Sequence, residues 1–506
     1  MSQHQHLEPQ EPSPPPAMTG RSLLDLPNEV LHEVCALLCL HCQEFLDVSC
    51  DGAFEGTTQK HKRARLHTTA PSKLRRPLHS VTEKHERIRI HVAALANLCR
   101  TSRRLNTLAT PFLYHVFFSM THQRPFFNFM RTLMQYPVLG TSVRQATFNI
   151  SRVGVDDKAS INKLVEHLGV WLPKGWKTPQ PVRRPVRDRD VDFGDGSFQE
   201  GFRHGFLVDM FLSSAVNLQP LSLQLSRTTS YGKFMLPSSS LQSLKSLHLA
   251  HRVTHRGETA GFNLEAVAGV LKKAPNLEYL EAYMCYSCPR RLNLSNLKVL
   301  TLPMCTLSSG MLRDLASSCK QLKAFTFEYI QPQGPDERLY YRPRVVPPGG
   351  ISRGLEHCSK TLEYLEIQVG NWEGIKELER HDMITSLKSF TALRTLVIDQ
   401  TCFLGGDVEQ EMGRPLFHTL LPASIAKVIL KGADLYCLFQ DLAELAKETE
   451  NGLFPDLKRL DIYCQAIGQQ HMPVSLDMAF RDAGVLLAAY VPENGKWVDV
   501  VKIGWL

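Results

Sequence analysis

Long hydrophobic runs are missing from this chain of 506 residues. The apolar run Val34–Leu40 is far too short to cross a bilayer, and no longer one occurs. The chain begins with a polar, proline-rich stretch that lacks the basic and apolar regions of a secretory signal. We therefore expect a cytoplasmic or nuclear protein without membrane contact, whose thirteen cysteines are mostly reduced and buried.

Motifs for catalysis are missing as well. The sequence contains no G-x-S-x-G, no H-E-x-x-H and no glycine loop with the lysine that holds a phosphate. The glycine-rich stretch FGDGSF lacks both that lysine and a helix behind it. These absences predict that the chain is not an enzyme and that it uses no cofactor.

Cysteine and histidine gather near the N-terminus, where a zinc site deserves consideration. The residues concerned are Cys35, Cys39, His41, Cys42 and Cys50. Cys35 and Cys39 share a helix that already has an apolar face, and no pair of C-x-x-C units occurs in this region. Buried structural cysteines are favoured over metal ligands, so the sequence predicts no metal site.

Positive charge is concentrated in one segment. Residues 57–90 hold ten Lys or Arg and two Glu, which accounts for the whole net charge of +8. The rest of the chain is neutral, so a basic groove for nucleic acid is not expected. The run KHKRAR could be a nuclear localisation signal, although a solvated loop is favoured.

Changes in composition divide the chain into three parts. Residues 1–20 are predicted to be a disordered tail, and residues 21–120 to be helices split by a disordered basic insert at about 42–86. Residues 121–506 form the third part, with a disordered loop predicted at about 174–201 because that stretch is rich in proline, glycine and charge.

The third part is repetitive. Segments such as LKSLHLAHR, LEYLEAYMC and LEYLEIQVG fit L-x-x-L-x-L-x-x-(small or Cys), which is the strand signature of a leucine-rich repeat. VRQATFNIS, from Val143, is a weaker copy. Nine copies begin at Leu218, Leu244, Leu277, Leu297, Leu322, Leu362, Leu393, Ile425 and Leu457. Helical pieces between the copies predict an α/β fold, an irregular solenoid with a parallel sheet on its concave face.

Side chains between the repeat leucines should point away from the core, onto the concave face. Acidic and aromatic residues dominate the middle of that face, and tyrosine is favoured at protein interfaces. An ordinary solvated face is equally compatible with this pattern. The candidate target-binding residues are Tyr279, Glu281, Tyr283, Glu328, Tyr364, Glu366 and Asp399.

The helical part resembles the F-box family, in the form found in fungal proteins with leucine-rich repeats. SLLDLPNEVLHEVCALL supplies the first half of the motif, and LANLCRTSRRLNTLATPFLYHVF supplies the second. The usual tryptophan of the family is replaced by Arg103, Arg104 and Leu105. The residues that match the family's adaptor-binding positions are Leu26, Pro27, Val30, Leu31, Val34, Leu38, Leu95, Leu98, Cys99 and Leu105.

The resemblance implies a role in ubiquitin transfer. F-box proteins bind a Skp-family adaptor, which links them to a cullin ubiquitin ligase, while the repeats hold a target protein. The chain is therefore expected to be a substrate-recognition subunit. The alternative is a leucine-rich-repeat interaction scaffold without a role in ubiquitin transfer, whose N-terminal helices only cap the repeats.

Overall fold

The fold is that of a computed structural model, which describes residues 22–46, 78–119, 123–148, 205, 208–225, 231–232, 241–251, 261–329, 346–369, 382–404, 416–464, 474–493 and 496–499. The predicted tail at 1–20 and the predicted loop at 174–201 lie outside these residues, as does Cys50. Among the helices in the described ranges, none combines the length and apolarity that crossing a membrane requires.

The N-terminal part is a small helical bundle. It consists of η1 (Leu23–Asp25), α1 (Asn28–Leu38), α2 (Leu40–Leu46), α4 (Leu78–Thr101) and α5 (Arg103–Leu113). Helix α5 begins behind Ser102, whose side chain accepts a hydrogen bond from the backbone N–H of Leu105 and so caps the helix. The bundle has a core of its own, built around Cys35, Cys39, Leu95, Ala109 and Phe112.

Helical structure reaches into both ends of the range 42–86, for which the sequence predicts disorder. Helix α2 continues to Leu46, and α4 begins at Leu78. The predicted insert is therefore too long at both ends. Its polar composition indicated disorder, although these end stretches are helical. Residues 47–77 lie outside the described part of the chain.

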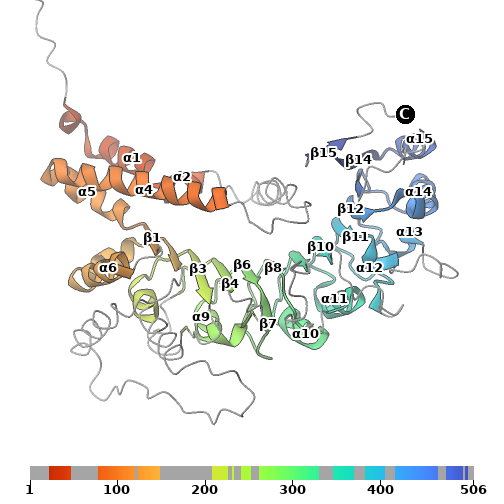
Figure 1. The fold of residues 1–506 in the computed structure, drawn as a ribbon, viewed down its shortest axis with the longest axis horizontal. Helices are drawn as coiled ribbons and strands as arrows, with labels where there is room; N and C mark the ends of the chain where they lie inside the picture. The colour runs from red at the N-terminus through yellow and green to blue at the C-terminus, as the bar shows by residue number, and fades with distance from the viewer. Residues whose placement is uncertain are drawn as a thin grey trace, which may run out of the picture.

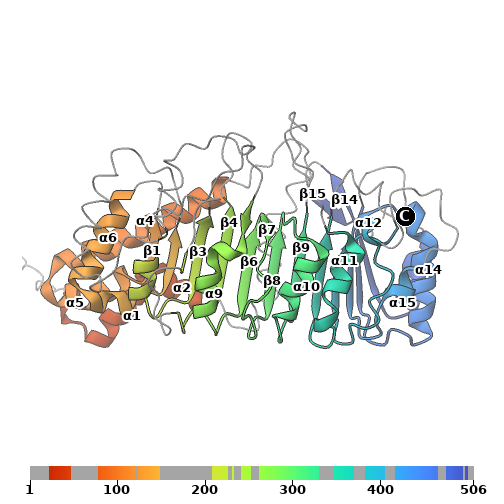
Figure 2. The ribbon, with the colours of Figure 1, turned by 90° about the horizontal axis from the view of Figure 1, so that it is seen from below.

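A sheet of thirteen strands follows, in which every neighbouring pair is parallel except the last (Figure 2). Its strands are β1 (Val116–Ser119), β2 (Gln145–Phe148), β3 (Pro220–Leu225), β4 (Ser246–His251), β6 (Tyr279–Tyr283), β8 (Val299–Pro303), β9 (Ala324–Glu328), β10 (Tyr364–Gln368), β11 (Thr395–Asp399), β12 (Lys427–Ala433), β13 (Arg459–Cys464), β14 (Leu486–Glu493) and β15 (Lys496–Asp499). Strands β5 (Phe262–Asn263) and β7 (Cys285–Ser287) form a separate pair. The predicted parallel sheet is thus confirmed, and its strands succeed one another in chain order.

Each of the nine predicted repeats contains one strand, which begins two residues after the first leucine or isoleucine. Leu277 precedes β6 at Tyr279 in this way, and Ile425 precedes β12 at Lys427. The weaker copy at Val143 supplies β2. Strands β1, β14 and β15 were not predicted, since they lie outside the repeats.

Helices cover the outer side of the curved sheet, whose strands line the inner side of an arc (Figure 1). They are η3 (Leu264–Val267), α9 (Ala268–Lys273), α10 (Ser309–Ser317), α11 (Pro348–Gly354), η5 (Glu356–Cys358), α12 (Thr401–Leu404), α13 (Phe417–Leu420), α14 (Leu435–Glu450) and α15 (Val474–Asp482). Two further elements, α6 (Gln123–Gln135) and η2 (Pro137–Ser142), lie near the first strands.

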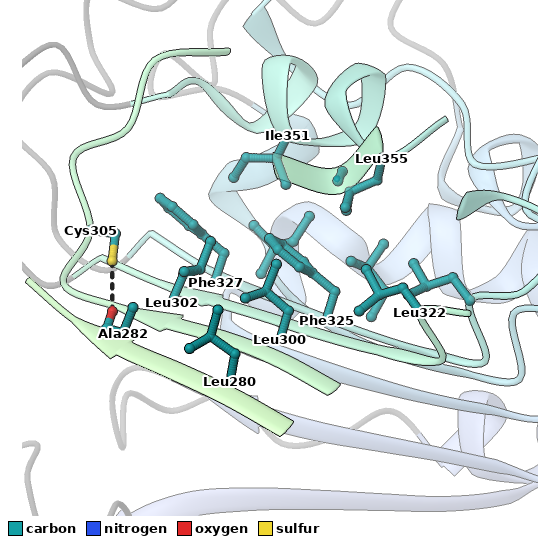
Figure 3. Close-up of a cluster of buried hydrophobic side chains, with 14 of the residues drawn as sticks. Leu280, Ala282, Leu300, Leu302, Cys305, Leu322, Phe325, Phe327, Ile351 and Leu355 are labelled. Carbon is teal, nitrogen blue, oxygen red and sulfur yellow. Dashed lines mark hydrogen bonds between the residues drawn. The ribbon is translucent and has the colours of Figure 1, made fainter. Parts of the chain in front are cut away.

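The core lies between the sheet and these helices. Leu280, Leu300 and Phe325 occupy matched positions on neighbouring strands and are fully buried. Leu302 and Phe327 form the next row, and Ile351 of α11 packs over them (Figure 3). Burial of each such side chain is worth about 1.5–3 kcal/mol, so one continuous apolar layer stabilises the whole sheet.

Cysteines at the ends of the repeats also face inward. The thiol of Cys305 donates a hydrogen bond to the carbonyl of Ala282 at 2.9 Å, and its sulfur accepts one from the backbone N–H of Cys285 (Figure 3). Burial raises the pKa of the Cys285 thiol to about 12. These cysteines therefore satisfy backbone groups where a strand turns away from the sheet, as protonated thiols.

Aromatic side chains cover the core at the end of the sheet where β1 and β2 lie. Phe117 of β1 lies 5.2 Å, centroid to centroid, from both Phe148 of β2 and Phe211. Phe126 and Phe129 of α6 pack against the same ring of Phe117. Aromatic clusters bury a large apolar area, so α6 and its neighbours shield this end of the sheet core.

Gly269 is a sensitive point of the core. Its α-carbon lies so close to Gly232, which has a φ of 75°, that a β-carbon would collide with the Gly232 backbone oxygen. We expect Gly269→Ala to destabilise the chain by about 1–3 kcal/mol, because the backbone must move. A lower urea midpoint in a circular-dichroism titration would show this.

Gly310→Ala is the matched control, because nothing lies within 4 Å of a β-carbon built there in α10. Alanine is preferred over glycine in helices, so this variant should be neutral or more stable by up to about 1 kcal/mol. Equal midpoints for the two variants would contradict the close approach of Gly269 to Gly232.

Candidate functional site

The matched adaptor positions do not share one surface. Leu31, Leu95 and Leu105 are buried inside the bundle, with 1–2% of their surface exposed. Leu38, Leu98 and Cys99 pack partly buried against the core of the bundle. Leu26 and Val34 are half-buried, and Pro27 and Val30 are exposed. The surface expected of these ten residues is therefore corrected: most of them hold the bundle together.

Two stripes on α1 explain this difference. Leu31, Cys35 and Leu38 follow one another at steps of four and three, and this stripe faces the core. Val30 and Leu37 lie seven residues apart on the neighbouring stripe, with 42% and 59% of their surface exposed. A helical period alone shows that such stripes exist, whereas the packing of α5 decides which of them is covered.

The Leu-Pro start of α1 is held in place by Arg104 of α5. Its guanidinium donates to the carbonyl of Leu26 at 2.8 Å and to Oδ1 of Asn28 at 2.9 Å, and also to the carbonyl of Leu24. Ser22 and Asp25 cap η1 by reciprocal hydrogen bonds. Leu23 and Leu24 are exposed on this fixed turn, so their apolar side chains are presented in an ordered conformation.

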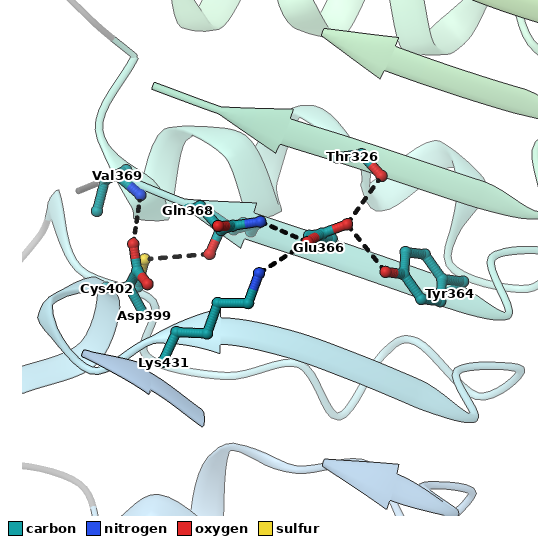
Figure 4. A network of polar contacts seen from close by, with 9 residues as sticks. Thr326, Tyr364, Glu366, Gln368, Val369, Asp399, Cys402 and Lys431 are labelled. Carbon is teal, nitrogen blue, oxygen red and sulfur yellow. Dashed lines mark hydrogen bonds and ion pairs between the residues drawn. The ribbon is translucent and has the colours of Figure 1, made fainter. Parts of the chain in front are cut away.

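The candidate target-binding residues differ in exposure. Tyr364 and Glu366 are buried, whereas Tyr279, Glu281, Tyr283, Glu328 and Asp399 are half-buried. Asp399 accepts a hydrogen bond from the backbone N–H of Val369 at 2.7 Å, so it joins β11 to the end of β10 (Figure 4). The predicted recognition surface is corrected at Tyr364 and Glu366, which lie on the concave face but are covered there by neighbouring side chains.

Glu366 is the centre of a buried polar network. Its Oε2 accepts a hydrogen bond from the Tyr364 hydroxyl at 2.9 Å, and its Oε1 lies 3.2 Å from Nζ of Lys431 (Figure 4). Thr326 and Gln368 donate to the same carboxylate. Four donors from the three strands β9, β10 and β12 compensate for burial of its negative charge, so this group fixes these strands to one another.

A similar arrangement occurs closer to the C-terminus. Asp461 has only 2% of its surface exposed and lies 2.8 Å from Nε of Arg459 and 3.3 Å from Nζ of Lys427. Tyr463 stacks on Tyr490 at 4.7 Å between ring centroids, and burial raises the pKa of Tyr463. The cations of the concave face are thus paired with buried carboxylates of the same face.

The half-exposed part of the concave face lies around Glu281. Its Oε2 accepts a hydrogen bond from the Tyr279 hydroxyl at 3.0 Å and lies 3.1 Å from Nδ1 of His248. The His248 ring packs on that of Tyr279, with 4.9 Å between the centroids. These groups combine aromatic surface with a carboxylate and an imidazole, which suits recognition of a polar protein segment.

Ser246, His248 and Glu281 form a hydrogen-bonded chain in the same order as the Ser-His-acid triad of a serine hydrolase. The Ser246 hydroxyl lies 3.0 Å from Nε2 of His248, whose Nδ1 contacts Glu281. Such an enzyme also needs free N–H groups for the oxyanion. The N–H of Ser246 instead donates to the carbonyl of Gln219, because Ser246 begins a central strand. The hydrogen bonds between Ser246, His248 and Glu281 orient these three side chains on the concave face.

Three of the residues for which the sequence predicts no metal site, Cys39, His41 and Cys42, lie beside His115, which the sequence does not connect with them. Cys39, His41, Cys42 and His115 each offer one ligand atom, and these atoms lie within 4.8 Å of one another. Burial lowers the pKa of His41 and of His115 to about 4, while it raises that of Cys42 to about 12. Cys39 and Cys42 form a single C-x-x-C unit in the sequence, without the second unit that a paired motif requires.

Comparison with protein-family models and with curated proteins finds no match for this chain.

The network of Glu366 leads to a stability prediction. Glu366→Lys should lower the free energy of unfolding by about 3–5 kcal/mol, because it removes the partner of Lys431 and adds a second buried cation. Glu281→Lys should cost less, about 1 kcal/mol, since Glu281 is only half-buried and its partner His248 is exposed. Urea titrations of both variants test this, and equal losses would contradict the difference in burial.

Proposed function

We propose that this chain is the substrate-recognition subunit of a cullin-type (SCF) ubiquitin ligase. In this proposal the N-terminal bundle is an F-box that binds a Skp-family adaptor, and the curved sheet is a leucine-rich-repeat solenoid that binds the target protein. The chain itself performs no chemistry. It accelerates ubiquitin transfer by holding the target close to the loaded enzyme, which raises the effective concentration of the reacting groups.

The observation that carries the proposal is the ordered apolar surface at the start of the bundle. Leu23, Leu24, Val30 and Leu37 are exposed, although the turn and helix that carry them are fixed by Arg104 and by the cap of η1. An apolar surface that is ordered before binding loses little conformational entropy when a partner covers it. This surface includes the Leu-Pro start on which the family resemblance rests.

A second observation supports this proposal over the scaffold alternative, in which the bundle only caps the repeats. The bundle has its own core around Cys35, Leu95 and Phe112, distinct from the core of the sheet. The first strands are shielded by Phe126 and Phe129 of α6. A bundle that is not needed as a cap is free to act as a docking module.

Adaptor binding can be tested with Val30→Asp combined with Leu37→Asp. Both side chains are exposed, so the fold should persist, while loss of two apolar contacts of about 1.5 kcal/mol or more each should weaken adaptor binding at least roughly 100-fold. Co-purification with a Skp-family adaptor and a titration by calorimetry measure the effect.

The matched control is Val138→Asp combined with Leu453→Asp, which changes two other exposed apolar residues outside the bundle. Leu31→Asp serves as a second reference, because Leu31 is buried and its variant should unfold the bundle. Full adaptor binding by the Val30 and Leu37 double variant would contradict the assigned surface. Absence of adaptor binding by the unaltered chain would favour the scaffold without ubiquitin transfer.

Target binding can be tested at Glu281. Glu281→Lys reverses the charge beside His248 and Tyr279, so it should remove the target from affinity purifications while leaving adaptor binding unchanged. Glu265→Lys is the control, since Glu265 is exposed on η3, outside the sheet. Quantitative mass spectrometry compares the two, and a target that both variants retain would place recognition outside this part of the face.

A further inference from the structure

We propose that Cys39, His41, Cys42 and His115 bind one zinc ion. The four residues converge from two parts of the chain: Cys39 ends α1, His41 and Cys42 belong to α2, and His115 lies between α5 and β1. Cys39 is buried and the other three are half-buried, so the ligand atoms gather at an internal junction.

Three of the distances between ligand atoms are close to those around a tetrahedral ion. Nδ1 of His115 lies 3.5 Å from Sγ of Cys39 and 3.5 Å from Sγ of Cys42, and Nδ1 of His41 lies 3.9 Å from Sγ of Cys42. Zinc bonds of about 2.3 Å to sulfur and about 2.0–2.1 Å to nitrogen place tetrahedral sulfur and nitrogen ligands roughly 3.6 Å apart. The His115 nitrogen thus lies almost at the required separation from both sulfurs.

The chemical type of the four ligand atoms indicates which metal the site would bind. Two thiolates and two imidazoles in a tetrahedral arrangement are typical of a structural zinc site, whereas magnesium and calcium prefer oxygen ligands. Binding releases one proton from each thiol, so two thiolates neutralise the ion completely. The nearby cation Arg144, which acts on both histidines, therefore faces a site without net charge.

The position indicates a mechanical role for the ion. Three ligands come from the end of α1 and the start of α2, whereas His115 lies directly before β1, the first strand of the sheet. Zinc would link the helical bundle to the sheet through its bonds to ligands from both. This role does not depend on ubiquitin transfer, so the zinc site and the proposed function can fail separately.

The first measurement is the metal content of the full-length chain. The chain is purified in buffer without chelator and analysed by elemental mass spectrometry. We expect one zinc per chain. Cobalt added to the metal-free chain should bind with the same stoichiometry and give the visible absorption of a tetrahedral site together with thiolate-to-cobalt charge transfer.

Three variants test the ligand set. Cys39→Ser, Cys42→Ser and His115→Asn should each weaken cobalt binding by more than the roughly 10- to 100-fold that loss of an outer-shell partner costs. Cys99→Ser is the matched control, because Cys99 packs against the same bundle core and is not one of the four ligands. Undiminished binding by His115→Asn would overturn the proposed set.

Protection of thiols tests the site without any substitution. In the zinc-loaded chain, Cys39 and Cys42 should react slowly with N-ethylmaleimide, and removal of the ion by a chelator should accelerate both, while Cys99 stays unchanged. Peptide mass spectrometry resolves the three cysteines. A chain that neither retains zinc nor binds cobalt, or one in which Cys39 and Cys42 form a disulfide instead, would overturn the proposal.

Discussion

Parallel pairing in a fixed register is the constraint on which most of this structure depends. Along the sheet, Leu280 pairs with Leu300, Leu300 with Phe325, and the same row continues through later strands. Because side chains alternate between the two faces of a strand, this register sends one set of residues to the core and the other to the concave face. A shift by one residue would bury Glu281 and expose Leu280, so the apolar layer and the polar face are fixed together.

This constraint explains why the sheet could be predicted from the sequence in such detail. The pattern L-x-x-L-x-L, with other apolar residues in some of its nine copies, determines the strands and the side that each apolar residue faces. Each strand begins two residues after the first apolar residue of its copy. The unpredicted strands β1, β14 and β15 lack this signal. Their place in the sheet is set by pairing with a neighbouring strand, which no local pattern shows.

The candidate sites could be predicted only in part, because contacts across the chain decide exposure. Glu366 lies on the concave face, as the alternation predicts, yet Lys431 reaches it from 65 residues further along and Tyr364 covers it. In the bundle, the sequence shows two apolar stripes on α1, but only the packing of α5 and the hydrogen bonds of Arg104 determine which one stays exposed. His115 joins Cys39 and Cys42 across 76 and 73 residues, a distance that spacing motifs do not detect.

The core of the bundle and the core of the sheet meet at a short junction in the chain. Leu113 packs against the core of the bundle, whereas the next residue, Tyr114, packs against the core of the sheet. The chain thus passes from one core to the other within a single peptide bond, and contacts near this crossing, such as those between α5 and η2, help to set how the two cores are oriented. Contacts beside that crossing have the largest effect on how the two cores are oriented. His115 lies there, in contact with the thiols of Cys39 and Cys42 and with the ring of His41. If the bundle docks one protein and the concave face another, the geometry of this junction sets the distance between the two partners, and proximity is the whole of the catalytic contribution that a recognition subunit makes.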